Sequence, residues 1–167
     1  MTGSALLSPQ FLEIAGLGLA GGLLVALAIT DWRHQILPDI LTGALLASGL
    51  IFALLNPHAD FTYAAVSAAA GAGAFWLIRI GYQTLRKREG LGLGDVKLMA
   101  GLGAWAGLVW LPLLVLVAAS GGLIYALILG LRKDGAISAT TALPFGTFLC
   151  AGAGVVAALK LMAPALI

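Results

Sequence analysis

Two aspartates, Asp31 and Asp95, lie at the ends of long apolar stretches, where an ionised carboxylate is costly unless it is hydrated, paired or functional. Two carboxylates that lie close together do not readily ionise at the same time, so such a pair holds one shared proton over a range of pH. The ionised member can take a proton from water while the protonated member gives one to a peptide carbonyl, which forms a gem-diol without a covalent intermediate. The two aspartates are therefore candidates for acid–base catalysis.

Glycines precede the second of these aspartates, in the segment Gly92-Leu93-Gly94-Asp95. They would let a substrate backbone approach closely and would permit backbone angles that other residues resist, although a flexible loop explains them equally well. Each aspartate taken alone also has a structural interpretation, either as a helix cap or as the partner of Arg33 or Lys97. The catalytic interpretation gains strength only if the fold brings Asp31 and Asp95 together.

The composition indicates a membrane protein. Of the 167 residues, 61% are hydrophobic and only 10% are charged, which lies far outside the range of soluble domains. The apolar segments lack the alternation of a membrane β-barrel, so helices are the expected spanning elements. We predict an all-α, polytopic fold with about six transmembrane helices, and one domain over residues 1–167. The predicted spans are 11–30, 40–55, 62–81, 96–111, 112–131 and 139–162, with a break at Trp110-Leu111-Pro112 inside the continuous apolar stretch 98–131.

The basic residues predict the orientation of these spans. Of the nine Lys and Arg residues, all but Lys160 fall on one face of the membrane when the six spans are counted: Arg33, Arg79, Arg86, Lys87, Arg88, Lys97, Arg132 and Lys133. The positive-inside rule makes that face cytoplasmic and places both termini outside. Asp31 follows one crossing and Asp95 follows three, so both carboxylates are expected on the cytoplasmic side, where they could meet.

Three segments together resemble the motif set of type IV prepilin peptidases, a family of polytopic aspartic proteases with a Gly-x-Gly-Asp motif. The segments are Asp31 to Thr42 (DWRHQILPDILT), Gly92 to Leu98 (GLGDVKL) and Leu143 to Gly146 (LPFG), and they occur in the family's order. The resemblance implies that Asp31 and Asp95 are the catalytic pair, with Gly92, Gly94, Pro38, Asp39 and Lys97 in supporting positions. It also implies cleavage of the N-terminal leader of prepilin-like proteins, after a glycine, at the cytoplasmic face of the inner membrane.

The supporting residues have structural alternatives. Asp39 would begin the second span, where the helix dipole favours a carboxylate, so we interpret it as structural or supporting and not as catalytic. Lys97 and Arg33 are first of all positive-inside anchors, and a role in tuning the acidic pair or in holding the substrate is the alternative.

No cofactor or metal is expected. The only cysteine, Cys150, lies in the last apolar segment, so neither a four-cysteine zinc site nor an internal disulfide can form. Longer members of the resembled family carry a cysteine-bearing N-terminal domain and also methylate the product. The sequence has no match to that domain, and we expect a minimal peptidase similar to those that serve tight-adherence pili or to archaeal preflagellin peptidases.

The expected partners are a prepilin-like substrate and the lipid bilayer, with no nucleic acid. Two other classes remain open. A presenilin-like intramembrane protease shares the Gly-x-Gly-Asp feature, although Pro38-Asp39 and Pro144-Phe145-Gly146 fit prepilin peptidases better. A small transporter or assembly factor is the non-enzymatic alternative, but a transporter is expected to place ionisable groups near the middle of the bilayer, and none of the spans does so.

Overall fold

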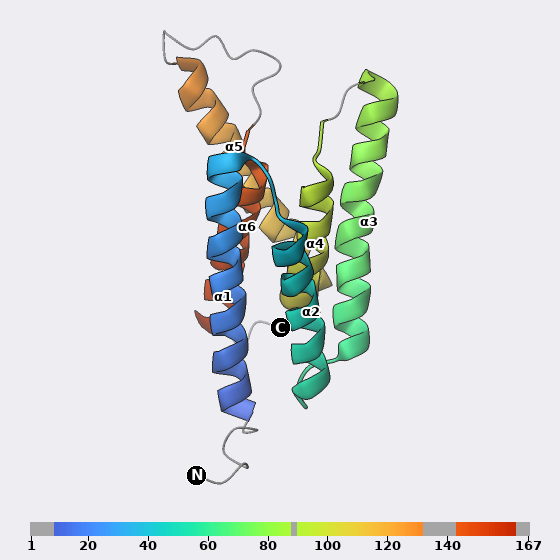
Figure 1. Cartoon of the computed structure of the whole chain (residues 1–167), viewed down its shortest axis with the longest axis vertical. Coiled ribbons are helices and arrows are strands. Elements are labelled where there is room, and N and C mark those ends of the chain that lie inside the picture. Colours follow the sequence, from blue (N-terminus) through green and yellow to red (C-terminus); the bar gives the residue numbers. More distant parts are fainter. Residues whose placement is uncertain (1–8, 88–89, 132–142, 163–167) are drawn as a thin grey trace.

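The computed structural model describes residues 9–87, 90–131 and 143–162, and within them the fold is all-α, as predicted (Figure 1). Six α-helices and one short 3-10 helix, η1, make up the described part of the chain. Their bounds are α1 Pro9–His34, α2 Asp39–Leu55, α3 Phe61–Arg86, α4 Leu93–Ala106, η1 Leu108–Trp110, α5 Leu111–Leu131 and α6 Phe145–Met162.

Four segments in the described residues are long and apolar enough to cross a membrane: Phe11–His34, Phe61–Arg86, Leu108–Leu131 and Phe145–Met162. The protein is therefore a multi-pass membrane protein. The helices α2 and α4 are shorter, with 17 and 14 residues, which corresponds to lengths of about 26 and about 21 Å at 1.5 Å per residue. The six predicted helices are thus present, but two of them are short for a full crossing of a hydrocarbon core about 30 Å thick.

The break within the apolar stretch 98–131 lies slightly earlier than predicted. α4 ends at Ala106 and not at residue 111, because Gly107 takes a positive φ of 80° that non-glycine residues rarely adopt. The 3-10 turn η1 follows, and its Leu108 N–H donates to the buried Ser67 hydroxyl at 2.9 Å. This partner satisfies a backbone donor that the interrupted helix leaves unpaired. Pro112 then stands in the first turn of α5, where a proline is tolerated.

The last helix begins at Phe145, so the predicted span 139–162 is correct over 145–162. Residues 139–142 lie outside the described part of the chain, as do three residues used for the predicted orientation, Arg88, Arg132 and Lys133.

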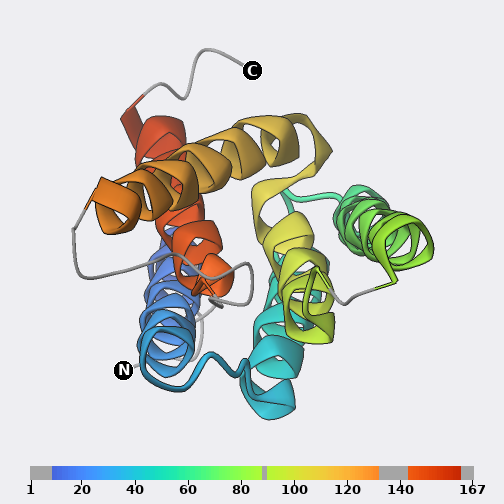
Figure 2. The same ribbon diagram turned by 90° about the horizontal axis from the view of Figure 1, so that it is seen from above.

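The helices form two groups, visible when the molecule is viewed from above (Figure 2). In one group α6 packs against α1 and α5, and in the other α4 packs against α2 and α3. Contacts of α1 with α2 and of α4 with α6 join the two groups. A core of buried side chains runs through the bundle and includes Leu27, Leu45, Leu98, Leu102, Leu114 and Leu149.

Close packing in the second group depends on two glycines. A Cβ added at Gly71 of α3 would lie 2.8 Å from the Met99 carbonyl oxygen of α4. A Cβ added at Gly103 of α4 would overlap the Ser67 carbonyl oxygen and would lie 2.9 Å from the Cα of Ala68, both on α3. The backbones of α3 and α4 therefore approach as closely as small-residue interfaces in membranes allow.

Candidate active site

Asp31 lies near the C-terminal end of α1 and is only 5% exposed. Its Oδ2 accepts a hydrogen bond of 2.6 Å from the backbone N–H of Thr147, and the Thr147 hydroxyl lies 3.0 Å from the same oxygen. Thr147 belongs to the first turn of α6, so these contacts join two helices that are far apart in the sequence. The carboxylate is thus buried, but it has polar partners.

Asp95 is the third residue of α4 and is 9% exposed. Gly92 is the N-cap of this helix, and its backbone N–H donates to the Asp95 carboxylate. A carboxylate at this position that reaches back to the N-cap amide satisfies one of the four N–H groups that lack a partner at a helix start. Asp95 is therefore held in the first turn of α4 by a contact with the N-cap residue of the same helix.

The two aspartates lie near one another. Leu37 packs against Gly94, the residue before Asp95, and against Gly146, where an added Cβ would lie 3.0 Å from the Asp31 Cγ. Figure 1 shows why: the connection from α1 to α2 and the connection from α3 to α4 lie at the same end of the bundle. The fold therefore brings together the two residues that the sequence analysis selected, from different helix groups.

Leu37 is the contact point of the three sequence segments. It is buried in the connection between α1 and α2. A Cβ added at Gly94 would lie 2.9 Å from the Leu37 Cβ, and one added at Gly146 would lie 3.0 Å from both the Leu37 Cδ1 and the Asp31 Cγ. Positions 94 and 146 therefore need glycine. A side chain at position 94 would press against Leu37, and one at position 146 would press against Leu37 and Asp31.

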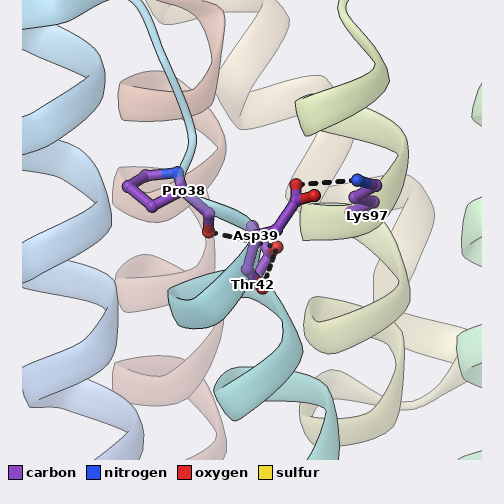
Figure 3. Close-up of polar contacts among 4 residues, drawn as sticks. All are labelled: Pro38, Asp39, Thr42 and Lys97. Carbon is purple, nitrogen blue, oxygen red and sulfur yellow. Dashed lines mark hydrogen bonds and ion pairs between the residues drawn. The ribbon is translucent and has the colours of Figure 1, made fainter.

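Asp39 and Lys97 form an ion pair between α2 and α4, with Asp39 Oδ1 2.7 Å from Lys97 Nζ (Figure 3). Both side chains are well exposed, at 74% and 48% respectively. Asp39 is the first residue of α2, as the helix-dipole argument predicted, and Pro38 is its N-cap. Lys97 therefore pairs with Asp39. This exposed ion pair links the N-terminal ends of α2 and α4, the two helices beside the site.

A side chain of α3 holds the segment that precedes Asp95. The Arg79 guanidinium donates from Nη1 to the Leu91 carbonyl oxygen at 2.5 Å. Gly92 follows in extended conformation, with φ −68° and ψ 146°. The glycine motif is thus an extended segment that leads into the N-terminus of α4. The backbone angles of Gly92 are ones that other residues can also adopt.

Within the described residues, no group of three or more His, Cys, Asp or Glu side chains is placed to hold a metal ion. Cys150 is buried and is a free thiol in α6.

The family model described as the type IV leader peptidase family matches residues 18–127 of this sequence. The chain belongs to this family. The matched region includes both aspartates and the glycine motif, so the resemblance inferred from the three segments is confirmed.

Several relatives of this family member have names that state an activity. It is 45% identical over 135 residues to the leader peptidase HopD of Escherichia coli, which covers 79% of this chain and 84% of that protein. It is 46% identical over 112 residues to the prepilin leader peptidase/N-methyltransferase of Dickeya chrysanthemi, which covers 67% of this chain and 40% of the relative.

A third relative, the prepilin leader peptidase/N-methyltransferase of Escherichia coli K12, is 39% identical over 128 residues, covering 77% of this chain and 56% of its own length. The chain therefore spans about half the length of the relatives named as bifunctional. No solved structure matches this family member significantly.

Sequence reasoning missed two residues of the site, Leu37 and Thr147. Leu37 lies inside the first motif, and its apolar character gave no reason to separate it from the neighbouring leucines. Thr147 immediately follows the Leu143–Gly146 motif. That position was the available signal, because a polar side chain directly after a motif and within an apolar helix needs a partner.

Proposed function

We propose that this protein is an aspartic endopeptidase that removes the N-terminal leader of prepilin-like proteins, with Asp31 and Asp95 as its catalytic residues. The observation that carries the proposal is that two buried carboxylates, one from α1 and one from α4, lie at the same end of a membrane bundle around Leu37. Membership of the leader peptidase family and the names of the relatives support the choice of substrate. Gly92, Gly94, Pro38, Asp39 and Lys97 support the site by shaping the starts of α2 and α4.

The reaction is the hydrolysis of one peptide bond. The ionised carboxylate takes a proton from a water molecule, whose oxygen attacks the scissile carbonyl, while the protonated carboxylate gives its proton to the carbonyl oxygen. In the collapse of the gem-diol, the carboxyl group that took a proton from water gives it to the leaving nitrogen, the other carboxylate takes a proton from a gem-diol hydroxyl, and the carbon–nitrogen bond breaks to leave an amine and a carboxylic acid. Water attacks the carbonyl carbon directly, so no covalent enzyme intermediate forms, and both carboxyl groups return to their starting protonation states at the end of the cycle.

The arrangement favours a leader peptidase over the alternatives. A presenilin-like protease would cut within the membrane, whereas here Asp31 and Asp95 lie at helix ends, beside the exposed pair Asp39 and Lys97. A transporter would need ionisable groups along a path through the bundle. We propose that the active site lies at the cytoplasmic surface of the inner membrane, and the positive-inside rule supports this side.

This orientation predicts a labelling pattern for single cysteines introduced in a Cys150→Ala background. His58 and Lys87 are both exposed, and they lie in connections at opposite ends of the bundle. In intact cells a membrane-impermeant thiol reagent should label His58→Cys and leave Lys87→Cys unlabelled, because the positive-inside rule places Lys87 in the cytoplasm. Permeabilised cells provide the control, since both cysteines should then react. Labelling of Lys87→Cys alone in intact cells would reverse the topology.

Removal of metal ions should leave cleavage unchanged, because the two carboxylates supply both the proton acceptor and the proton donor. The purified protein is incubated with a detergent-solubilised prepilin, with and without an excess of chelator, and the product is identified by its mass. Equal amounts of leaderless pilin in the two samples are expected. Activity that disappears with the chelator and returns on addition of a divalent metal would contradict a carboxylate-only mechanism.

A further inference from the structure

We propose that Thr147 is a positioning residue that fixes the Asp31 carboxylate for catalysis, an inference that rests on the proposed catalytic role of Asp31. Both polar groups of Thr147 reach the same carboxylate oxygen: the backbone N–H at 2.6 Å and the hydroxyl at 3.0 Å from Oδ2. Two contacts from one residue restrict both the rotation and the displacement of the Asp31 side chain. The remaining carboxylate oxygen, Oδ1, receives no contact from Thr147.

The start of α6 makes the backbone contact possible. Thr147 is the third residue of this helix, so its N–H is among the first amides, which have no partner inside the helix. Gly146 precedes it, and a Cβ there would lie 3.0 Å from the Asp31 Cγ. The absence of a side chain at Gly146 therefore lets the carboxylate of α1 approach the α6 amides, and Asp31 provides the partner that this amide needs.

The hydroxyl contact has a second feature, which suits a residue whose protonation changes during the reaction. The Thr147 Oγ1 also lies 3.1 Å from the carbonyl oxygen of Ala28, on the turn of α1 just before Asp31. A hydroxyl has one proton to donate and two lone pairs that accept. When Asp31 is ionised, Thr147 can donate to its Oδ2. When Asp31 is protonated, Thr147 can accept from the acid and donate to Ala28 instead.

One threonine therefore offers a hydrogen bond to both protonation states of Asp31 without moving. A valine has the same shape and keeps the backbone N–H contact with Asp31, but it lacks the hydroxyl and both of its hydrogen bonds, whereas a serine keeps them. This difference separates a positioning role from simple filling of space between α1 and α6. Thr30, the neighbour of Asp31, offers a matched control, because its hydroxyl lies 3.0 Å from the carbonyl oxygens of Ala26 and Leu27 in its own helix and, within the described residues, makes no hydrogen bond to another helix.

The experiment measures kcat and KM for a prepilin that the unmodified protein cleaves, using the full chain in detergent. Thr147→Val should lower kcat about tenfold to a hundredfold, since small misplacements of a catalytic group have effects of this order, and should leave KM nearly unchanged. Thr147→Ser should retain most of the activity. Thr30→Val should behave like the unmodified protein. Thr147→Ala is a second variant without the hydroxyl, in case valine is poorly accommodated, and the melting temperature of every variant is measured alongside.

Two results would overturn the inference. One is a Thr147→Val protein that folds and cleaves as fast as the Thr30→Val control. The other is a loss of activity in the valine and alanine variants that is fully matched by loss of folded protein or appears only in KM. Failure of the proposed function itself gives a different result, because Asp31→Asn would then still cleave the substrate, whatever the Thr147 variants do.

Discussion

Replacement of Asp31 or Asp95 by asparagine is expected to abolish prepilin cleavage while leaving the protein inserted and folded. Asparagine keeps the size of the side chain but cannot exchange the proton that the reaction requires. Loss of a general acid or base costs about 10²- to 10⁴-fold in rate. Since the two carboxylates act as a unit, the double variant should be little worse than either single variant. Cleavage is measured with the purified proteins and a detergent-solubilised prepilin, by the mass of the product.

Asp39→Asn is the matched comparison for this pair of variants. It makes the same chemical change in a neighbouring carboxylate, but Asp39 is 74% exposed and is paired with Lys97. An exposed ion pair contributes little to stability, so this variant should fold normally and retain much more activity than the other two. Substantial cleavage by folded Asp31→Asn or Asp95→Asn protein would remove the basis of the proposed mechanism.

Substitution of Gly103 by alanine should have the largest effect on the stability of the bundle. The added Cβ would meet the backbone of α3 at Ser67 and Ala68, which can yield only if the two helices move apart. Overpacking of this kind costs typically about 1–3 kcal/mol. Because α4 carries Asp95, a displaced α4 should also lower the cleavage rate. The fraction of protein that stays monodisperse after heating in detergent measures the first effect.

Gly73→Ala provides the control for this comparison, because a Cβ added at Gly73 of α3 has no neighbour within 4 Å. Alanine is also the better helix former, by about 1 kcal/mol in a helix interior. Gly73→Ala should therefore be neutral or slightly stabilising. If both variants melted at the same temperature as the unmodified protein, the close approach of α3 and α4 would not be what limits stability.

The sequence predicted the helical fold because hydropathy alone identifies apolar segments of spanning length. It did not predict the end of α4, because that end depends on the positive φ of Gly107 and on the hydroxyl that Ser67 provides from another helix. Small residues often mark close helix contacts in membrane proteins, and Gly71 does so here. Gly43 and Gly73 do not, since a Cβ at either has no neighbour within 4 Å. Glycine content shows that close contacts are possible but not which face makes them.

For the candidate site, too, the general location could be predicted from the sequence but the individual contacts could not. Counting the predicted crossings was enough to predict that Asp31 and Asp95 lie at the same end of the bundle, although they are far apart in the sequence. The contacts around them could not be predicted in the same way. The partner of Lys97 is Asp39, and the partner of Asp31 is Thr147, and both pairings depend on how helices rotate about their axes. Neither spacing nor composition determines that rotation.

The two aspartates come from different helix groups, and this has a consequence for how the candidate site is assembled. Asp31 lies on α1 and is hydrogen-bonded to Thr147 of α6, whereas Asp95 lies on α4, which packs against α2 and α3. Neither group alone contains both carboxylates. The pair therefore depends on the contacts of α1 with α2 and of α4 with α6 that join the two groups.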